Sequence, residues 1–270
     1  EFGLLSAYRA DGLMPQEAYD VVHDLFRSGE LDQDTAELTA AARASGNPVV
    51  PFVERMRARV AEADAEAARW VHLGATSQDV LDTALMLLAR DELEEAVAAL
   101  GDAATTLVAL AVRHRDDPAA ARTLDQHAVP TTIGARTAIW LRAIVRARRR
   151  LADTAAELPV QLGGAAGTQA SFVQLFGAGA AARLPAALAE AVQLVPPPAP
   201  WHTDRYPILD LAHAAGAAIA AMGKTASDVV TLARTEIAEA SAGAGGSSAM
   251  PQKRNPVDAV LLRSAAMRAP

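Results

Sequence analysis

The strongest constraint on the fold is a long helical pattern that follows Asp82. Apolar and small residues recur there at steps of three, four or seven: Met86, Leu93, Val97, Leu100, Ala104, Leu107 and Ala111. This spacing places them along one face of an α-helix. Continued to about Arg113, the helix is roughly 45–50 Å long at 1.5 Å per residue. A helix of that length buries its apolar stripe best against other long helices, so the pattern predicts a bundle.

Two further segments have the same period. One runs from Thr131 to about Glu157, and the other runs from Tyr206 to about Ala240. Small residues in the last of these segments, at positions 214–218, allow close approach of helices, which suits a tightly packed bundle. We predict an all-α fold, with a smaller helical N-terminal domain over residues 1–75 and a central long-helix bundle over residues 76–270. The chain stops where a helix has only just begun, so we expect the C-terminal part of the bundle to be missing.

The composition argues against several classes of function. The net charge is −7, and no basic run is interleaved with aromatic residues, which argues against a nucleic-acid partner. The absence of cysteine excludes disulfides, thiolate metal sites and cysteine nucleophiles. The six histidines show no short metal-ligand spacing, and no apolar run approaches the ~20 residues that span a bilayer. We expect a soluble, cytoplasmic protein with no metal, no other cofactor and no membrane partner.

The segment that most strongly indicates chemistry lies near the C-terminal end. A glycine-rich approach leads into Ser247-Ser248-Ala249-Met250-Pro251-Gln252-Lys253-Arg254-Asn255-Pro256. A serine can take a proton from carbon only if nearby positive charge or N–H groups stabilise its alkoxide. Lys253 and Asn255 can supply that help, and the enolate-like carboxylate formed needs it too. The alternative interpretation is a surface linker followed by a helix cap.

Two earlier segments are rich in hydroxyl and amide groups. Thr76 and Ser77 stand at the predicted start of the long helix, where hydroxyls and free N–H groups can bind a carboxylate. The alternative there is an ordinary helix cap, in which Asp79 or Asp82 satisfies the first turn. The other segment runs from Arg122 to Gly134, and its alternative interpretation is simply a helix start after Pro130.

The three segments, in this order, resemble the signature regions of the fumarase/aspartase superfamily of lyases. The resemblance spans most of the chain and implies an all-α long-helix bundle. It also implies β-elimination, or the reverse addition, on a small succinyl-type di- or tricarboxylate substrate. In this superfamily the regions come from different subunits of a homotetramer, so the resemblance implies active sites shared between subunits.

The same resemblance implies roles for individual residues. Ser247 is the base, chosen over Ser248 from the spacing to Lys253 in the family motif, and Lys253 with Asn255 stabilises the doubly charged intermediate. The implied substrate contacts come from the two earlier segments: His72, Thr76, Ser77, Thr123, Gln126 and His127. Arg205, with His202 and Thr203, is a second candidate anion contact, and its alternative is a surface ion pair.

Departures from the family pattern narrow the choice of reaction. Adenylosuccinate and argininosuccinate lyases carry a histidine where Leu124 stands, and this histidine protonates the departing nitrogen. A carboxylate or nitrite can leave as an anion without a proton, so leucine at this position points to an anionic leaving group. The resemblance therefore favours the 3-carboxy-cis,cis-muconate cycloisomerase branch, with nitrosuccinate lyase as an alternative. Asp125 is unusual for the cycloisomerases and either points to solvent or marks a changed substrate. An adenylosuccinate lyase-like enzyme and a non-catalytic scaffold of the superfamily are further alternatives.

Overall fold

A computed structural model describes residues 1–241, 246, 250 and 253–269 of the chain. The chain divides into two compact units, which we describe separately. Unit 1 contains residues 1–91 and 156–207, and unit 2 contains residues 92–155 and 208–270. The division into domains at residue 75 stays a prediction.

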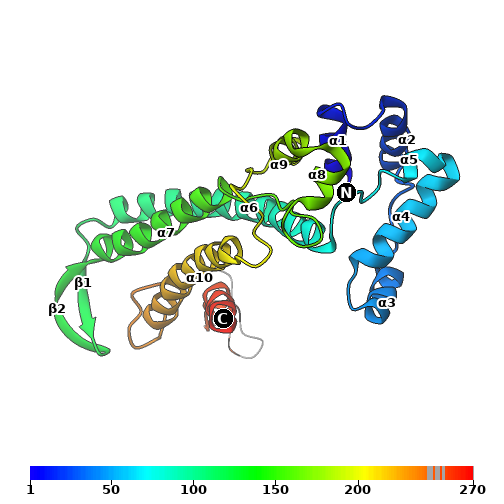
Figure 1. The fold of residues 1–270 in the computed structure, drawn as a ribbon. Coiled ribbons are helices and arrows are strands. Elements are labelled where there is room, and N and C mark those ends of the chain that lie inside the picture. Colours follow the sequence, from blue (N-terminus) through cyan, green and yellow to red (C-terminus); the bar gives the residue numbers. More distant parts are fainter. Residues whose placement is uncertain (242–245, 247–249, 251–252, 270) are drawn as a thin grey trace. The chain divides into compact units, whose positions relative to one another are not determined.

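Unit 1 contains short helices (Figure 1), and all of them except α3 contribute residues to one apolar core. They are α1 (Phe2–Ala10), α2 (Gln16–Arg27), α3 (Thr35–Ser45), α4 (Val49–Ala63), α5 (Ala65–Ala68), α8 (Ala170–Phe176) and α9 (Ala178–Val192). Helix α1 packs against α9, although the two are far apart in the sequence. The fully buried Tyr8, Phe172 and Leu184 lie in this core, so the later segment completes the packing of the first helices.

The long helix predicted from the sequence is α6 (Ser77–Arg113), with 37 residues. Its limits match the apolar pattern, and it runs from unit 1 into unit 2. We expected no segment able to cross a membrane, but α6 is long and apolar enough by length and composition alone. Only 6% of its most apolar window is buried within the described chain. A helix in the core of a bundle can pass the same test of length and composition, so this one helix is weak evidence for a membrane span.

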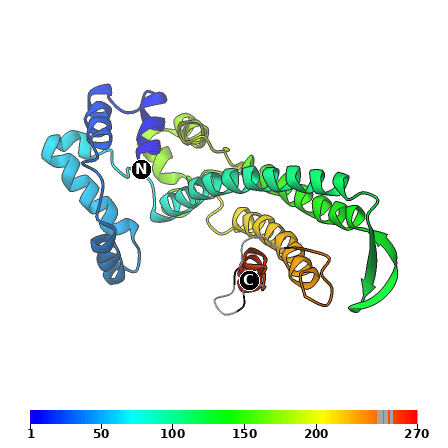
Figure 2. The ribbon, with the colours of Figure 1, turned by 180° about the vertical axis from the view of Figure 1, so that it is seen from behind.

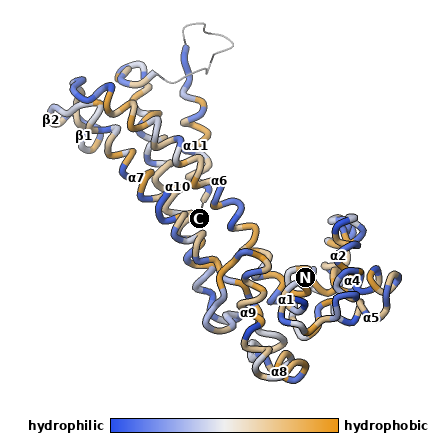
Figure 3. Tube along the Cα trace, turned by 90° about the horizontal axis from the view of Figure 1, so that it is seen from above, coloured by the Kyte–Doolittle hydropathy of each residue, from blue (hydrophilic) through white to orange (hydrophobic). Residues whose placement is uncertain are grey.

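Unit 2 contains the second half of α6 with α7 (Ile133–Ala155), α11 (Val257–Arg268) and most of α10 (Tyr206–Leu232). Figure 3 shows apolar and polar residues interleaved along these helices. The buried Trp140 of α7 donates a hydrogen bond from Nε1 to Asp228 Oδ2 of α10 at 2.6 Å. Gly134 lets α7 approach α6 closely, since a Cβ there would lie 2.6 Å from the carbonyl oxygen of Ala111.

The predicted end of α10 at about Ala240 was wrong, because the helix ends at Leu232. The chain turns back over the next residues, and Ala238 has a φ of 51° in the left-handed region. The amides of Glu239 and Ala240 both donate to the Leu232 carbonyl, at 3.0 and 3.1 Å. Helical periodicity does not reveal this turn, because the apolar spacing continues through it.

A small antiparallel hairpin, which the sequence analysis did not predict, joins α6 to α7 (Figure 2). Strands β1 (Pro118–Thr123) and β2 (Gln126–Thr132) are connected by Leu124 and Asp125, whose φ angles are 49° and 61°. Two positive φ values are typical of a type I′ turn, which usually carries Asn-Gly. The sequence Leu-Asp gives no such signal. The helix start considered after Pro130 lies at Ile133, and Thr131 and Thr132 belong to β2. Leu124 is 98% exposed at the turn.

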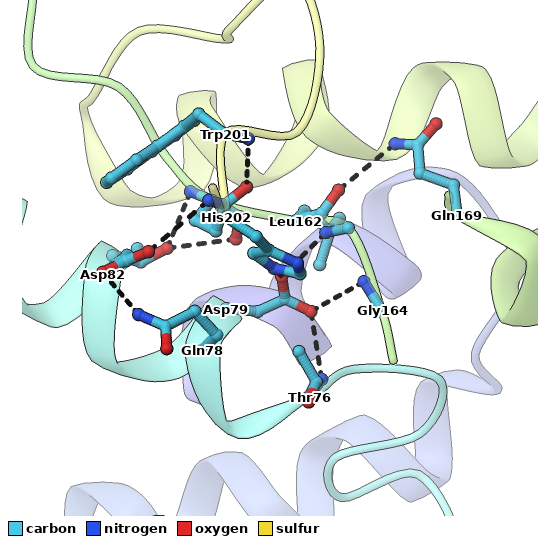
Figure 4. A network of polar contacts seen from close by, with 12 residues as sticks. Thr76, Gln78, Asp79, Asp82, Leu162, Gly164, Gln169, Trp201 and His202 are labelled. Carbon is cyan, nitrogen blue, oxygen red and sulfur yellow. Dashed lines mark hydrogen bonds and ion pairs between the residues drawn. The ribbon is translucent and has the colours of Figure 1, made fainter. Parts of the chain in front are cut away.

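One buried carboxylate joins three segments of unit 1 at the start of α6. Asp79 is 4% exposed, and its Oδ1 accepts hydrogen bonds from the Gly163 amide and from His202 Nε2, both at 2.7 Å. Its Oδ2 accepts from the amides of Gly164 at 2.9 Å and Thr76 at 3.0 Å. Figure 4 shows donors from the loop, the helix start and His202 converging on this side chain.

A second set of bonds holds the same segments one turn further along α6. The Thr83 hydroxyl donates to the Gln161 carbonyl at 3.2 Å and accepts from the Gln161 amide at 2.9 Å. The Gln161 side chain accepts from the Trp201 amide at 3.1 Å, and Trp201 Nε1 donates to the Val160 carbonyl at 2.8 Å. The loop before α8 and the segment before α10 are therefore both fixed against α6.

We expect Asp79→Asn to destabilise the protein by about 2–4 kcal/mol, because an amide nitrogen would face N–H donors where an oxygen accepted them. Chemical unfolding followed by circular dichroism measures this loss. Asp91→Asn is the matched control on the same helix, since the Asp91 side chain is 67% exposed and its only pair in the described part of the chain is with Arg90 at the surface. Equal stabilities for the two variants would contradict the role assigned to Asp79.

Candidate active site

Thr76 and Ser77 lie at the N-terminus of α6, as the sequence analysis predicted. The carbonyl of Thr76 accepts from the amides of Asp79 and Val80, at 3.0 and 3.4 Å, and Asp79 reaches back to the Thr76 amide. This is half of a capping box, so the structure contains the helix cap considered as the alternative. The hydroxyls of Thr76 and Ser77 are half-buried and make no hydrogen bond among the described residues. The cap therefore leaves both hydroxyls free for a ligand.

His72 lies just before this helix start, in a left-handed conformation with a φ of 57°. Its Nδ1 is 2.6 Å from Oε1 of Glu1, and both side chains are largely buried. Burial alone would raise the pKa of Glu1, but the hydrogen bond with His72 helps to lower this pKa below its usual value. Glu1 is therefore ionised at neutral pH and orients the His72 ring.

Arg205 forms an ion pair with a buried partner. Its two Nη atoms donate to the two carboxylate oxygens of Asp82, each at 2.8 Å, and its guanidinium carbon lies 5.2 Å from the centre of the Trp201 ring. Burial alone would raise the pKa of Asp82, but hydrogen bonds from Arg205 and Gln78 outweigh it and hold this pKa below its usual value. Arg205 is therefore in an ion pair, which was the alternative to the predicted anion contact, and its partner Asp82 is buried.

His202 was grouped with Arg205 from the sequence, and the structure gives its ring a defined environment. Its Nε2 lies 2.7 Å from Oδ1 of the Asp79 carboxylate and donates a hydrogen bond to it, which fixes the orientation of the ring. A Cβ at Gly163 would lie 2.9 Å from both His202 Cε1 and the Gly167 Cα, so a glycine is required for this approach. The position of Asp79 in the first turn of the long helix could be predicted from the sequence. Its hydrogen bond with His202 could not, because the two residues are far apart in the chain.

The predicted contacts of the second segment gather at the tip of the hairpin in unit 2. Thr123 and Gln126 are paired across the two strands, and His127 is paired with Arg122. Thr123, Gln126 and His127 are exposed. Nη2 of Arg122 lies 3.4 Å from His127 Nε2, so the basic side chain flanks these three polar groups.

The third segment is only partly described. Ser247, the predicted base, and Ser248 lie outside the described residues. The exposed Lys253 donates its amide to the Met250 carbonyl at 3.0 Å, and Asn255 Nδ2 donates to the Gly246 carbonyl at 3.1 Å. Pro256 caps α11, as expected for a proline at a helix start.

The structure thus divides the predicted site residues between the two units. Unit 1 contains His72, Thr76, Ser77 and Arg205, and the described members in unit 2 are Thr123, Gln126, His127, Lys253 and Asn255. Within the described ranges, no group of three or more His, Asp or Glu side chains has the arrangement of a metal site. The site chemistry available is that of hydroxyls, imidazoles, a lysine and helix-terminal N–H groups.

Known proteins similar to this chain are lyases and cycloisomerases. A family described as lyases matches residues 16–270. The chain is 46% identical to nitrosuccinate lyase of Streptomyces davaonensis over 277 residues, covering 100% of this chain and 58% of that protein. It is 42% identical to 3-carboxy-cis,cis-muconate cycloisomerase of Bradyrhizobium diazoefficiens over 275 residues, covering 100% of this chain and 59% of that protein. The chain therefore spans less than two thirds of either relative.

Solved structures agree with the fold. The 3-carboxy-cis,cis-muconate lactonizing enzyme from Pseudomonas putida is similar with a TM-score of 0.89 and 38% identity, covering 100% of this chain and 59% of that one. Fumarate lyase from Mesorhizobium sp. BNC1 gives a TM-score of 0.84 and 30% identity, covering 99% of this chain and 58% of that one. These findings confirm the predicted all-α long-helix fold. With a family match over residues 16–270, the chain belongs to the lyase family of the fumarase/aspartase superfamily.

Proposed function

We propose that the protein catalyses β-elimination, or the reverse addition, on a succinyl-type polycarboxylate with an anionic leaving group. The observation that carries the leaving-group assignment is Leu124. It stands next to Thr123 at the hairpin tip, where the related lyases that expel a nitrogen carry a proton donor, and its side chain is 98% exposed and apolar. A leaving group that departs as a stable anion needs no such donor.

In this mechanism Ser247, as an alkoxide, takes the proton from the carbon next to a substrate carboxylate. The negative charge that develops on that carboxylate is stabilised by Lys253 and Asn255. The free hydroxyls of Thr76 and Ser77 at the start of α6 bind a second carboxylate, because the helix N-terminus carries partial positive charge. His72, Thr123, Gln126 and His127 complete the predicted contacts, whereas the guanidinium of Arg205 is already bound to Asp82. The carbon–oxygen or carbon–nitrogen bond on the neighbouring carbon then breaks, and lactone closure is the reverse of this step.

Two substrates are candidates. The cycloisomerase reaction on 3-carboxy-cis,cis-muconate is supported by the resemblance of the signature segments and by a relative at 42% identity. Nitrosuccinate is supported by a relative at 46% identity and by Asp125, a residue unusual for the cycloisomerases. Asp125 is exposed at the hairpin turn beside the predicted contacts. It adds negative charge there, which disfavours a substrate of higher charge.

We also propose a homotetramer with shared active sites, in the cytoplasm. Helix α6 carries large apolar side chains that are exposed in the single chain: Leu81, Leu85, Leu88, Val108 and Val112. Such a stripe on a long helix is typical of a surface that other helices cover.

Light scattering on the full-length protein tests the assembly. We expect a mass four times that of one chain, and we expect Leu88→Lys to reduce it, because a charge would be buried in the bundle. The exposed Glu94→Lys, which lies on another face of the helix because it is six residues from Leu88, is the control for added charge. A fully active monomer would contradict the proposal of shared sites.

The substrate is tested with an absorbance assay that offers nitrosuccinate and 3-carboxy-cis,cis-muconate separately. We expect one of the two to be consumed, either with release of fumarate and nitrite or with loss of the muconate chromophore. Consumption of nitrosuccinate alone makes a role of Asp125 in specificity the next hypothesis to test. If wild-type protein consumes neither substrate, the proposal of these two reactions is wrong.

Ser247→Ala is expected to lower kcat by several orders of magnitude and to leave the fold unchanged, because the variant lacks only the base. The matched control is Ser248→Ala, which changes the neighbouring hydroxyl and leaves Lys253 in place. Steady-state kinetics and circular dichroism measure both effects. If Ser248→Ala is the inactive variant, the base has been assigned to the wrong serine.

A further inference from the structure

A largely buried cluster of charges in unit 2 has no role in the mechanism described above. Glu239, in the turn after α10, accepts a hydrogen bond on Oε1 from Arg122 Nη2 at 2.7 Å. Its Oε2 accepts one from Arg136 Nη1 at 2.6 Å. The Glu239 side chain is 19% exposed and each arginine is 15% exposed. A single carboxylate therefore connects strand β1, helix α7 and the turn after α10.

The hairpin needs such a connection because its tip has little apolar packing. At its base, the backbone is fixed by bonds from the Ile133 amide to the Asp117 carbonyl at 3.0 Å and from the Gly134 amide to the His114 carbonyl at 2.8 Å. Beyond the base, β2 is exposed from Gln126 to Pro130. A two-stranded hairpin without a packed face is only marginally stable by itself.

The cluster of Glu239, Arg122 and Arg136 contacts the hairpin near its tip. Arg122 immediately precedes Thr123 and is paired across the strands with His127. Arg136 adds a second contact with β1, since its Nη2 donates to the Ala120 carbonyl at 2.8 Å. Strand β1 carries Thr123 and pairs with β2, which carries Gln126 and His127. It is thus held to α7 by one arginine and to Glu239 by the other.

Glu239 is itself held in place by its backbone. Its amide donates to the Leu232 carbonyl at 3.0 Å, so the turn folds back onto the end of α10. The hydrogen bond from Arg122 is the main reason why the pKa of Glu239 lies below its usual value; burial opposes it, and Arg136 adds to it. The carboxylate is therefore ionised at neutral pH, and its negative charge lies between two guanidinium groups that would otherwise repel each other.

We propose that Glu239 is a positioning residue for the reaction. It fixes the hairpin tip, and with it Thr123, Gln126 and His127, relative to α7 and α10. It acts through Arg122 and Arg136 and does not touch the substrate. The inference rests on the proposed function, because it is the proposed substrate contacts at the tip that need a fixed position.

The kinetic test compares Glu239→Gln with Glu236→Gln in the full-length protein, using the substrate that wild-type protein consumes. Glu236 is the matched control, because it lies in the same turn and is exposed. We expect Glu239→Gln to lower kcat/KM by about 10- to 100-fold, mainly through KM, since a displaced contact loses both binding and orientation. Glu236→Gln is expected to behave as wild type. Glu239→Asp, which keeps the charge on a shorter side chain, should recover part of the loss.

Hydrogen–deuterium exchange of the amides of residues 118–132 tests the connection without any substrate. We expect faster exchange near the tip in Glu239→Gln and unchanged exchange in Glu236→Gln. If Glu239→Gln does not fold, the same comparison is made with Glu239→Asp. If exchange is faster in Glu239→Gln but wild-type protein consumes neither substrate, the proposed function is wrong. The contact of Glu239 with the hairpin would still be supported. Equal exchange in the Glu239 and Glu236 variants, or equal kinetics, would overturn the proposed role of Glu239.

Discussion

The Asp79 carboxylate is the interaction on which the arrangement of unit 1 depends. Its two oxygens accept from Thr76, Gly163, Gly164 and His202, which belong to three segments far apart in the sequence. A buried charge is tolerated only when its hydrogen-bonding capacity is filled, and here four N–H groups fill it. The same bonds cap α6, fix the loop before α8 and orient the His202 ring. The Asp79 carboxylate therefore holds the fold of unit 1 together and also fixes the helix start that carries the predicted contacts Thr76 and Ser77.

Some polar groups are already bound to partners within the chain, and others are available to bind a ligand. Asp82 is bound to Arg205, Glu239 to two arginines and Asp228 to Trp140, so each of these carboxylates already has a partner. In contrast, the Thr76 and Ser77 hydroxyls make no hydrogen bond among the described residues, and the Lys253 side chain is exposed. Groups whose bonding capacity is free can bind a substrate without first breaking an internal contact.

The two units use different means to hold their predicted contacts. In unit 1 a packed core and the Asp79 bonds fix the helix start that carries Thr76 and Ser77. In unit 2 the hairpin extends from two long helices, and ion pairs take the place of a core. Ion pairs fix orientation through directional bonds but contribute less stability than apolar burial. The exposed apolar stripe of α6 is consistent with the proposed assembly, in which other chains would supply the missing packing.

The sequence by itself determined the long helices, the superfamily and the candidate segments. The limits of α6 and the start of α10 could be predicted because helical period is a property of neighbouring residues. The hairpin could not, since Leu124 and Asp125 adopt a turn that their residue types do not favour. Nor could the partners of Asp79, Arg205 and Glu239 be predicted. Only the tertiary structure decided these pairings, because they depend on the distances between segments that are remote in the chain, and residue type alone does not encode those distances.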